Sequence, residues 1–233
     1  MNASRLRWAA LAINMICASA YADPGFVLSP TGQATGNTCQ SYALGVALAF
    51  KRDPLFKVNT AAELRSVELG IREEIKKVSG TNDVSHDHIK QGFDAYTKGI
   101  YKLTFKDVTI PDVGSEAGRR SGITSAALVP ANFLLGAVVK DVVLASATRI
   151  DANPYGSGHI FTVLGADGPP NSGQRLLILN SAVKVKDKTR NTCTDGVPDD
   201  PGPYTAELSW KSISDINFKP FGGKIRLWFV EKS

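Results

Sequence analysis

The chain has 233 residues and a formal net charge of +5, from 27 basic and 22 acidic side chains. The basic residues are scattered and are not interleaved with aromatic residues, so the composition gives no indication of a nucleic-acid interface. Hydrophobic residues make up 43% of the chain, which is enough material for a core of ordinary domain size.

The first 22 residues have the pattern of a secretory signal peptide. Arg5 and Arg7 precede an apolar run that is too short to cross a membrane, and small-x-small cleavage motifs end at Ala20 and Ala22. An N-terminal anchor is the alternative interpretation. Cleavage before Asp23 leaves 25 basic and 22 acidic side chains, a net charge of +3. We therefore expect residues 23–233 to be secreted or periplasmic, without membrane association.

The mature chain begins with a polar loop, residues 23–38, that leads into an apolar run. The run "TCQSYALGVALAF" carries small and apolar residues on every side, which is typical of a buried helix. Thr38 is the expected N-cap, so Cys39 would be the first helical residue. The motif "KRDP" ends this helix.

Two further helices are expected before the first strand. Thr60 and Glu63 form a capping box, and Gly80 closes the segment. Between them, apolar residues recur at helical spacing at Leu64, Val67, Ile71, Ile75 and Val78. A third helix is expected from Ser85 to about Thr97.

The rest of the chain favours a sheet. Alternation of apolar and polar residues predicts a strand at 100–110, and β-branched, apolar or alternating runs predict others at 141–150, 159–166, 175–183 and 222–232. In the last of these, Ile225, Leu227 and Phe229 are expected to face inward, opposite Lys224, Arg226 and Trp228. Residues 128–140 are a further helix candidate, and 184–203 are expected to form a long polar loop.

Helices followed by strands indicate an α+β fold. We expect one mature domain with a helical lobe at about 23–110 and a β lobe at about 111–233.

His86 and His88, with Asp83 and Asp87 nearby, raise the question of a metal site. No other histidine or cysteine joins them at ligand spacing. The preferred interpretation is a helix start capped by Ser85, with Asp87 near its positive end. No metal and no other cofactor is expected.

His159 opens an apolar run, "HIFTVLGA", and a Pro- and Gly-containing turn separates this run from "QRLLILNS". If the two runs form an antiparallel hairpin centred between Pro169 and Pro170, His159 stands opposite Asn180. Directly opposed residues point to the same face, with Cβ atoms about 5 Å apart. The Asn180 oxygen could then accept a hydrogen bond from one ring nitrogen and leave the other to face a thiol.

These residues form a chemical constellation. A helix N-terminus and a nearby imidazolium both lower the pKa of a thiol, so Cys39 is the candidate nucleophile. His159 is the candidate general base and acid. Gln33, six residues before Cys39, can direct its side-chain NH₂ at a developing oxyanion, with the Cys39 backbone N–H as second donor.

The order Gln-x5-Cys, His, Asn resembles that of papain-like cysteine peptidases. The matching stretches are "QATGNTCQSYA", "GSGHIFTVLG" and "LLILNS". The resemblance implies a helical lobe carrying the cysteine, a β lobe carrying the histidine and asparagine, and a substrate cleft between them. It also implies that Cys39, His159, Asn180 and Gln33 are the catalytic residues. Gln40 after the cysteine, and "NSAV" in place of "NSWG", indicate a divergent, bacterial-type member.

The resemblance implies a thiol-dependent endopeptidase. Its partners would be peptide or protein substrates and, as a further candidate, a protein inhibitor; no nucleic-acid partner is expected, and the chain is expected to be a monomer. Two alternatives remain open. One is a cell-wall peptide amidase of the Cys-His type. The other is a non-enzymatic exported binding protein in which Cys39 and Cys193 form a disulfide.

Overall fold

The structure is a computed structural model that describes residues 32–35, 38–80, 84–125, 139–148, 158–169, 173–184, 204–216, 218 and 222–233. The predictions for the signal peptide, for most of the helix candidate at 128–140 and for all but the first residue of the loop at 184–203 concern residues outside this set. Within it, no helix is both long enough and apolar enough to cross a membrane.

The described chain contains helices and one antiparallel sheet, so the α+β prediction is confirmed. The four α-helices are α1 (Cys39–Lys51), α2 (Ala61–Ser79), α3 (His86–Thr97) and α4 (Val113–Ser121). The strands are β1 (Tyr101–Thr109), β2 (Val143–Thr148), β3 (Gly158–Asp167), β4 (Arg175–Lys184), β5 (Tyr204–Ser212) and β6 (Lys224–Lys232).

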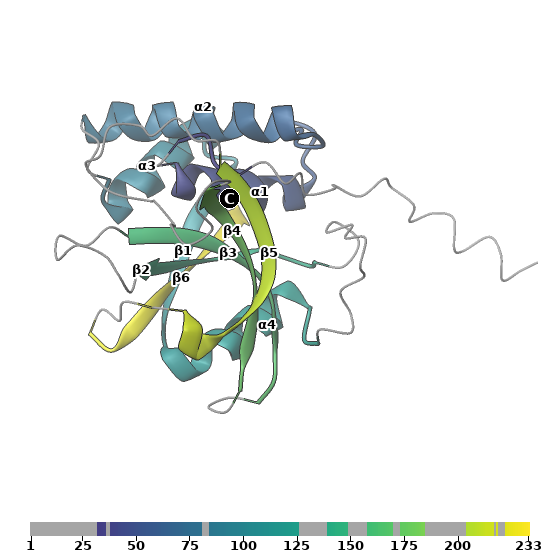
Figure 1. Cartoon of the computed structure of the whole chain (residues 1–233). Coiled ribbons are helices and arrows are strands. Elements are labelled where there is room, and N and C mark those ends of the chain that lie inside the picture. Colours follow the sequence, from purple (N-terminus) through teal and green to yellow (C-terminus); the bar gives the residue numbers. More distant parts are fainter. Residues whose placement is uncertain are drawn as a thin grey trace, which may run out of the picture.

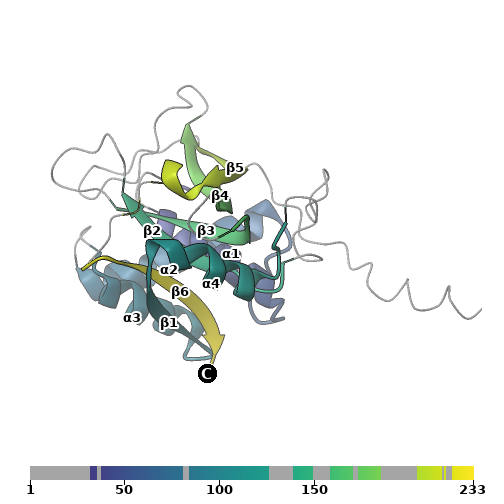
Figure 2. The same ribbon diagram turned by 90° about the horizontal axis from the view of Figure 1, so that it is seen from below.

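The six strands form one sheet with the order β1-β6-β2-β3-β4-β5. Helices α1, α2 and α3 lie together on one side of it (Figure 1). Seen from below, α4 crosses the opposite face (Figure 2), where it packs on β3 and β2. The predicted boundary between the two lobes lies near residue 110, after β1 and before β6. β1 pairs along its whole length with β6, so the chain segments on the two sides of that boundary share one sheet.

The first three helices begin and end where local signals predict. Thr60 and Glu63 form the capping box of α2, and Gly80 ends it in the left-handed conformation, with a φ of 66°. α1 begins at Cys39 as expected, but the Thr38 side chain makes no cap hydrogen bond. Its Oγ1 instead accepts from the Thr35 N–H at 3.1 Å, because the preceding loop folds back on the helix start.

Sequence analysis missed two elements, α4 and β5. α4, "VGSEAGRRS", has too few apolar residues for helical periodicity, and its glycines serve close packing instead. A Cβ on Gly114 would lie 2.1 Å from the amide end of the Gln174 side chain, so a larger residue there would require that side chain to move. β5 is mostly half-exposed and alternates weakly, since it is the edge strand beside β4.

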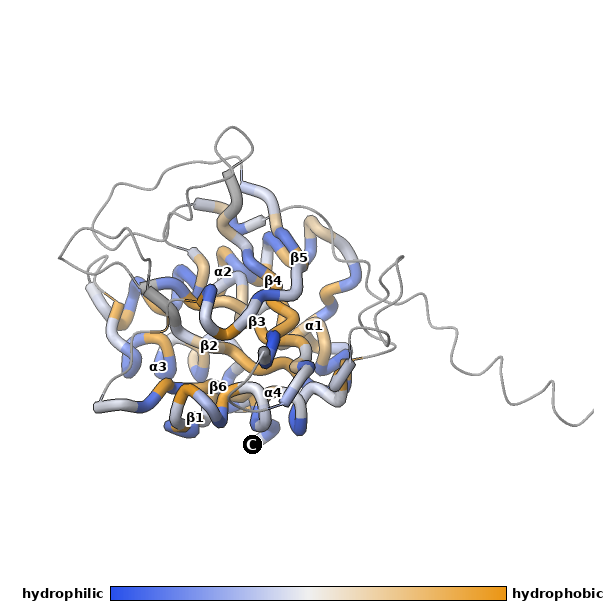
Figure 3. The backbone as a smooth tube through the Cα atoms, turned by 60° about the horizontal axis from the view of Figure 1, so that its bottom comes forward, coloured by the Kyte–Doolittle hydropathy of each residue, from blue (hydrophilic) through white to orange (hydrophobic). Residues whose placement is uncertain are grey.

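The sheet has an apolar core on each face. Residues of α1, α2 and α3 pack on the first face against side chains that include Leu103, Leu144, Leu164, Leu177, Leu179, Trp228 and Val230. α4 covers part of the second face, whose core includes Val108, Phe161, Val163, Ile178, Ile225, Leu227 and Phe229. Figure 3 shows hydrophobic residues gathered along α1 and the central strands.

Trp228 corrects one expectation from the sequence. It was predicted to lie on the polar side of the last strand, but it is buried. The reason is that this face of β6 is covered by helices: Trp228 belongs to the first core, with residues of α1, α2 and α3. Ile225, Leu227 and Phe229 do face the second core, as predicted.

Candidate functional site

β3 and β4 form the predicted hairpin, but in a different register. Thr162 pairs with Leu179 and Val163 with Ile178, and the register shifts between Val163 and Gly165. Continuing the first pairs would place Asn180 opposite Phe161, two residues from the predicted partner. The prediction of direct opposition between His159 and Asn180 is therefore wrong. A shift of two residues preserves the side-chain face, so the two residues are diagonal neighbours on the same face.

The hydrogen bond expected between these side chains is present. His159 Nε2 lies 3.0 Å from Asn180 Oδ1, and Oδ1 also accepts from the Ala182 N–H at 3.2 Å. Because this oxygen only accepts, Nε2 is the donor, and the neutral ring carries its lone pair on Nδ1. His159 is buried, and its ring lies 6.2 Å from that of Phe161, centroid to centroid. The imidazole is thus held in one tautomer and one orientation.

Gln33 is hydrogen-bonded to β4, the strand that carries Asn180. Its backbone N–H donates to Ser181 O at 2.9 Å, and its side-chain Oε1 accepts from Ser181 Oγ at 2.9 Å. The Nε2 group donates to Thr35 O at 2.6 Å, and the side chain is buried. Consecutive residues of β4, Asn180 and Ser181, therefore orient His159 and Gln33. The β4–β5 register shifts between Asn180 and Val183, next to this point.

Cys39 is the first residue of α1 and is buried, as a nucleophile placed at a helix N-terminus would be. The structure records it as disulfide-bonded, with a partner outside the described residues. A sulfur in a disulfide has no thiolate form, so it cannot act as a nucleophile until the bond is reduced. Any nucleophilic role of Cys39 therefore requires that this disulfide first be reduced.

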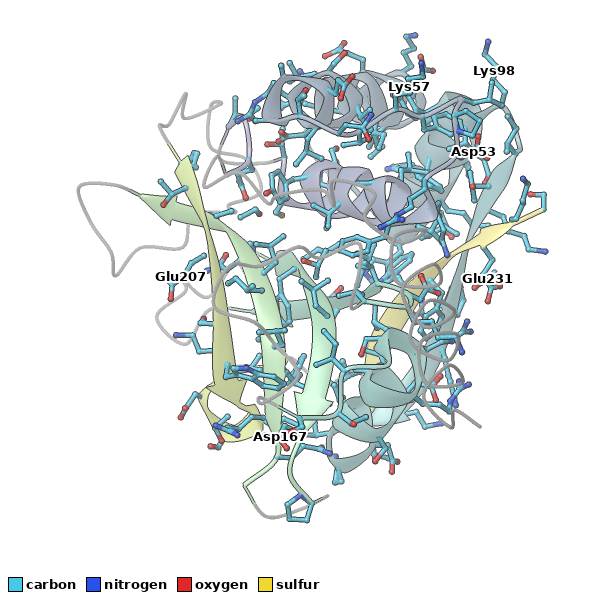
Figure 4. All side chains as sticks on the ribbon, turned by 90° about the vertical axis from the view of Figure 1, so that its right-hand side faces the viewer. Asp53, Lys57, Lys98, Asp167, Glu207 and Glu231 are labelled. Carbon is cyan, nitrogen blue, oxygen red and sulfur yellow. The ribbon has the colours of Figure 1, made fainter. Side chains whose placement is uncertain are left out.

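The four candidate residues come from three parts of the chain. His159 and Asn180 touch directly, and Gln33 meets their hairpin through Ser181. Cys39 is carried by α1, which packs on β3 and β4. Figure 4 shows Asp167 at the turn end of the β3–β4 hairpin, away from α1 and α2. His159 and Asn180 therefore lie toward the other end of the hairpin.

Sequence analysis missed a polar cluster on α2 that contacts the segment before Cys39. Glu68 Oε1 accepts from the Ala34 N–H at 2.6 Å. Arg65 donates to Glu68 and, through Nη2, to Gly32 O at 2.7 Å. Arg72 donates to Thr35 Oγ1 at 2.6 Å. The sequence signal was the row of charged residues that lies beside the apolar stripe of this amphipathic helix.

Burial raises the pKa of Glu68, and hydrogen bonds from Thr38 and Ala34 together with the charge of Arg65 offset only part of that rise. The Glu68 side chain has 0% exposure. A carboxyl group in this position is costly to ionise unless its partners remain in place.

The two histidines of α3 have different contacts: His88 completes the capping box, and His86 packs against the sheet. Ser85 accepts from the His88 N–H at 3.2 Å, and His88 Nδ1 accepts from the Ser85 N–H at 3.3 Å. The His86 ring packs edge-on against Trp228, with centroids 4.6 Å apart. In the part of the chain that the structure describes, no three His, Cys, Asp or Glu side chains are grouped as a metal site would require. Asp83 lies outside the described residues.

Comparisons with known proteins give no family assignment: no protein-family model matches the sequence, and no curated protein matches it significantly.

Proposed function

We propose that the mature chain is an exported, thiol-dependent endopeptidase of the papain-like type, latent while Cys39 is disulfide-bonded. The observation that carries the proposal is the hydrogen bond between His159 and Asn180, on a hairpin that also fixes Gln33. This arrangement sets the imidazole tautomer that a Cys-His catalytic pair requires.

Each residue has a defined role in the proposed reaction. After reduction, the Cys39 thiolate attacks the peptide carbonyl carbon, and the oxygen takes on the negative charge. Gln33 Nε2–H and the Cys39 backbone N–H stabilise that charge. The His159 imidazolium donates its proton to the leaving amine, and the C–N bond breaks. His159 then takes a proton from water, which hydrolyses the thioester and releases the acid and the thiol.

Latency follows from the chemistry of the disulfide. Two equivalents of an added thiol reduce the bond, release Cys39 and its partner as thiols, and are themselves oxidised to a disulfide. Among the cysteines of the chain, Cys193 is the proposed partner because Cys17 lies in the expected signal peptide. Exported proteins keep disulfides in oxidising surroundings, so activity would be restrained until a reductant is met.

The test combines activity with thiol labelling. Wild type treated with dithiothreitol should hydrolyse a denatured protein substrate, and untreated wild type should not. Cys39→Ala should remain inactive with dithiothreitol, at a loss on the order of 10⁴-fold or more, while its thermal unfolding stays cooperative. Alkylation of reduced protein at pH about 5.5, two to three units below the ordinary cysteine pKa, should modify Cys39 quickly, and His159→Ala should slow it.

A non-enzymatic exported binding protein is the second candidate, and the disulfide at Cys39 specifically favours it. In that case reduction would lower the melting temperature without producing hydrolysis. Cys39 and Cys193 would also react at equal, slow rates. Peptidoglycan stem peptides included in the substrate set would detect a cell-wall amidase, the remaining alternative.

A further inference from the structure

We infer that Glu68 is a positioning residue that sets the placement of the Gln33–Cys39 segment for catalysis; this inference rests on the proposed peptidase function. Glu68 lies on α2, 29 positions after Cys39 in the sequence, and has 0% side-chain exposure. Its carboxylate reaches the backbone between the candidate oxyanion donor and the candidate nucleophile.

The contacts of α2 cover most of the described part of this segment. Glu68 binds the Ala34 N–H at 2.6 Å and is also hydrogen-bonded by the side chain of Thr38. Arg65 joins the carboxylate to Gly32 O, and Arg72 binds Thr35 Oγ1. We call Arg65, Glu68 and Arg72 the α2 clamp.

The clamp follows from helix geometry. Its members are spaced i, i+3 and i+7, so they lie along one face of α2. The adjacent stripe of Leu64, Val67, Ile71 and Ile75 is buried in the first core. α2 therefore packs through its apolar stripe and presents the clamp to the segment ahead of α1.

A buried carboxylate is a poor source of net stability, because desolvation offsets most of the attraction to its cation. What the clamp does supply is geometric restraint. The Ala34 N–H belongs to the peptide that follows Gln33, so the hydrogen bond to Glu68 fixes the backbone from which the Gln33 side chain projects. A displacement of about 1 Å at such a donor can cost about 10²-fold in rate.

The α2 clamp is tested by a double-mutant cycle in the reduced protein. Glu68→Gln keeps the side-chain shape but loses the charge, and we expect kcat to fall by about 10-fold or more with KM little changed. In a Gln33→Ala background, Glu68→Gln should lower kcat by less than about 2-fold, because the donor it positions is already absent. Glu73→Gln, at an exposed site on the same helix, is the matched control and should leave kcat unchanged.

Equal losses in the two backgrounds would overturn the inference, since a merely structural role would lower both alike. Amide hydrogen exchange at Ala34 provides a readout that does not require activity, and Glu68→Gln should accelerate it in folded protein whereas Glu73→Gln should not. Absence of Cys39-dependent hydrolysis in reduced wild type would reject the proposed function instead. If hydrolysis is absent, an unchanged rate of amide exchange at Ala34 in Glu68→Gln would also reject the α2 clamp. A faster rate would show that the clamp restrains the backbone at Ala34 without a role in catalysis.

Discussion

The two halves of the candidate site are held in place by different kinds of interaction. His159 pairs with Ala147 of β2, and Asn180 pairs with Glu207 of β5, so backbone ladders to neighbouring strands fix their positions. Gln33 and Cys39 lie on a loop and at a helix start, and the loop depends on side chains of Ser181 and the α2 clamp. A strand keeps its geometry when one side chain changes, whereas a loop held by a few buried side chains does not. The loop half should therefore be the more sensitive to polar substitutions around it.

Two buried carboxylates on opposite faces of the sheet sharpen this contrast. Glu116 of α4 bonds Lys106 at 2.9 Å and also bonds Arg119. Burial raises the pKa of Glu116, but these hydrogen bonds outweigh it and lower the pKa overall. For Glu68, burial outweighs Thr38, Ala34 and Arg65, so the pKa is raised. The cationic partners of Glu116 therefore favour its ionised form, whereas burial of Glu68 disfavours its ionised form.

The largest expected effect comes from the apolar support of the strand half. Leu179, directly before Asn180, is 2% exposed and belongs to the first core. Leu179→Ala should lower the free energy of unfolding by about 2–5 kcal/mol through lost burial and a residual cavity. Urea denaturation measures this. Leu55→Ala, at a site 69% exposed, should change it by less than about 0.5 kcal/mol. Similar small losses for both variants would contradict the assigned core.

Asn180→Ala should break the orientation of the strand half while leaving the ladder intact. Without Oδ1, the His159 ring is free to rotate and to change tautomer, so reduced enzyme should lose about 10²-fold in kcat. Steady-state kinetics on a peptide substrate, with cooperative thermal unfolding as the check on folding, measures the loss. Wild-type kcat in this variant would mean that Asn180 has no part in catalysis.

Ser181→Ala should have a smaller effect and act on the loop half. It removes the hydrogen bond to Gln33 Oε1 but leaves the Gln33 N–H bond to Ser181 O. The loss of one neutral hydrogen bond, about 1 kcal/mol, corresponds to about 5-fold in kcat. KM should be unchanged, because the oxyanion forms only in the transition state. A change confined to KM would show that Gln33 binds substrate rather than the oxyanion.

The pH dependence of stability should have opposite signs for the two buried carboxylates. The ordinary glutamate pKa is 4.5. Folded Glu68 holds its proton above that value, so its contribution falls as pH rises from about 4.5. Folded Glu116 releases its proton below it, so its contribution is lost as pH falls below about 4.5.

Melting temperatures between pH 3 and 7 test this for Glu68→Gln and Glu116→Gln. The advantage of wild type over Glu68→Gln should be larger at low pH than at pH 7. The advantage over Glu116→Gln should be larger at pH 7 than at low pH. Parallel trends for the two variants would contradict the assigned environments.

Local signals in the sequence predicted much of the fold. The capping box at Thr60, the glycine at Gly80 and the helical spacing of apolar residues gave α2 its limits, because each acts within one or two turns of the chain. Alternation predicted β1 and β6, and β-branched, apolar runs predicted β2, β3 and β4. The predicted hairpin also put His159 and Asn180 on one face, and this holds because a register change of two residues leaves the face unchanged.

Only the tertiary structure decided the register of the hairpin, the burial of Trp228, the α2 clamp and the disulfide at Cys39. Each of these depends on groups that lie far apart in the sequence: Ala34 and Glu68 are 34 residues apart, and Gln33 and Ser181 are 148 apart. Periodicity reports how a residue sits within its own helix or strand. Which partner a buried side chain meets is set by how the elements pack, so residue types at the site were readable from the chain and their contacts were not.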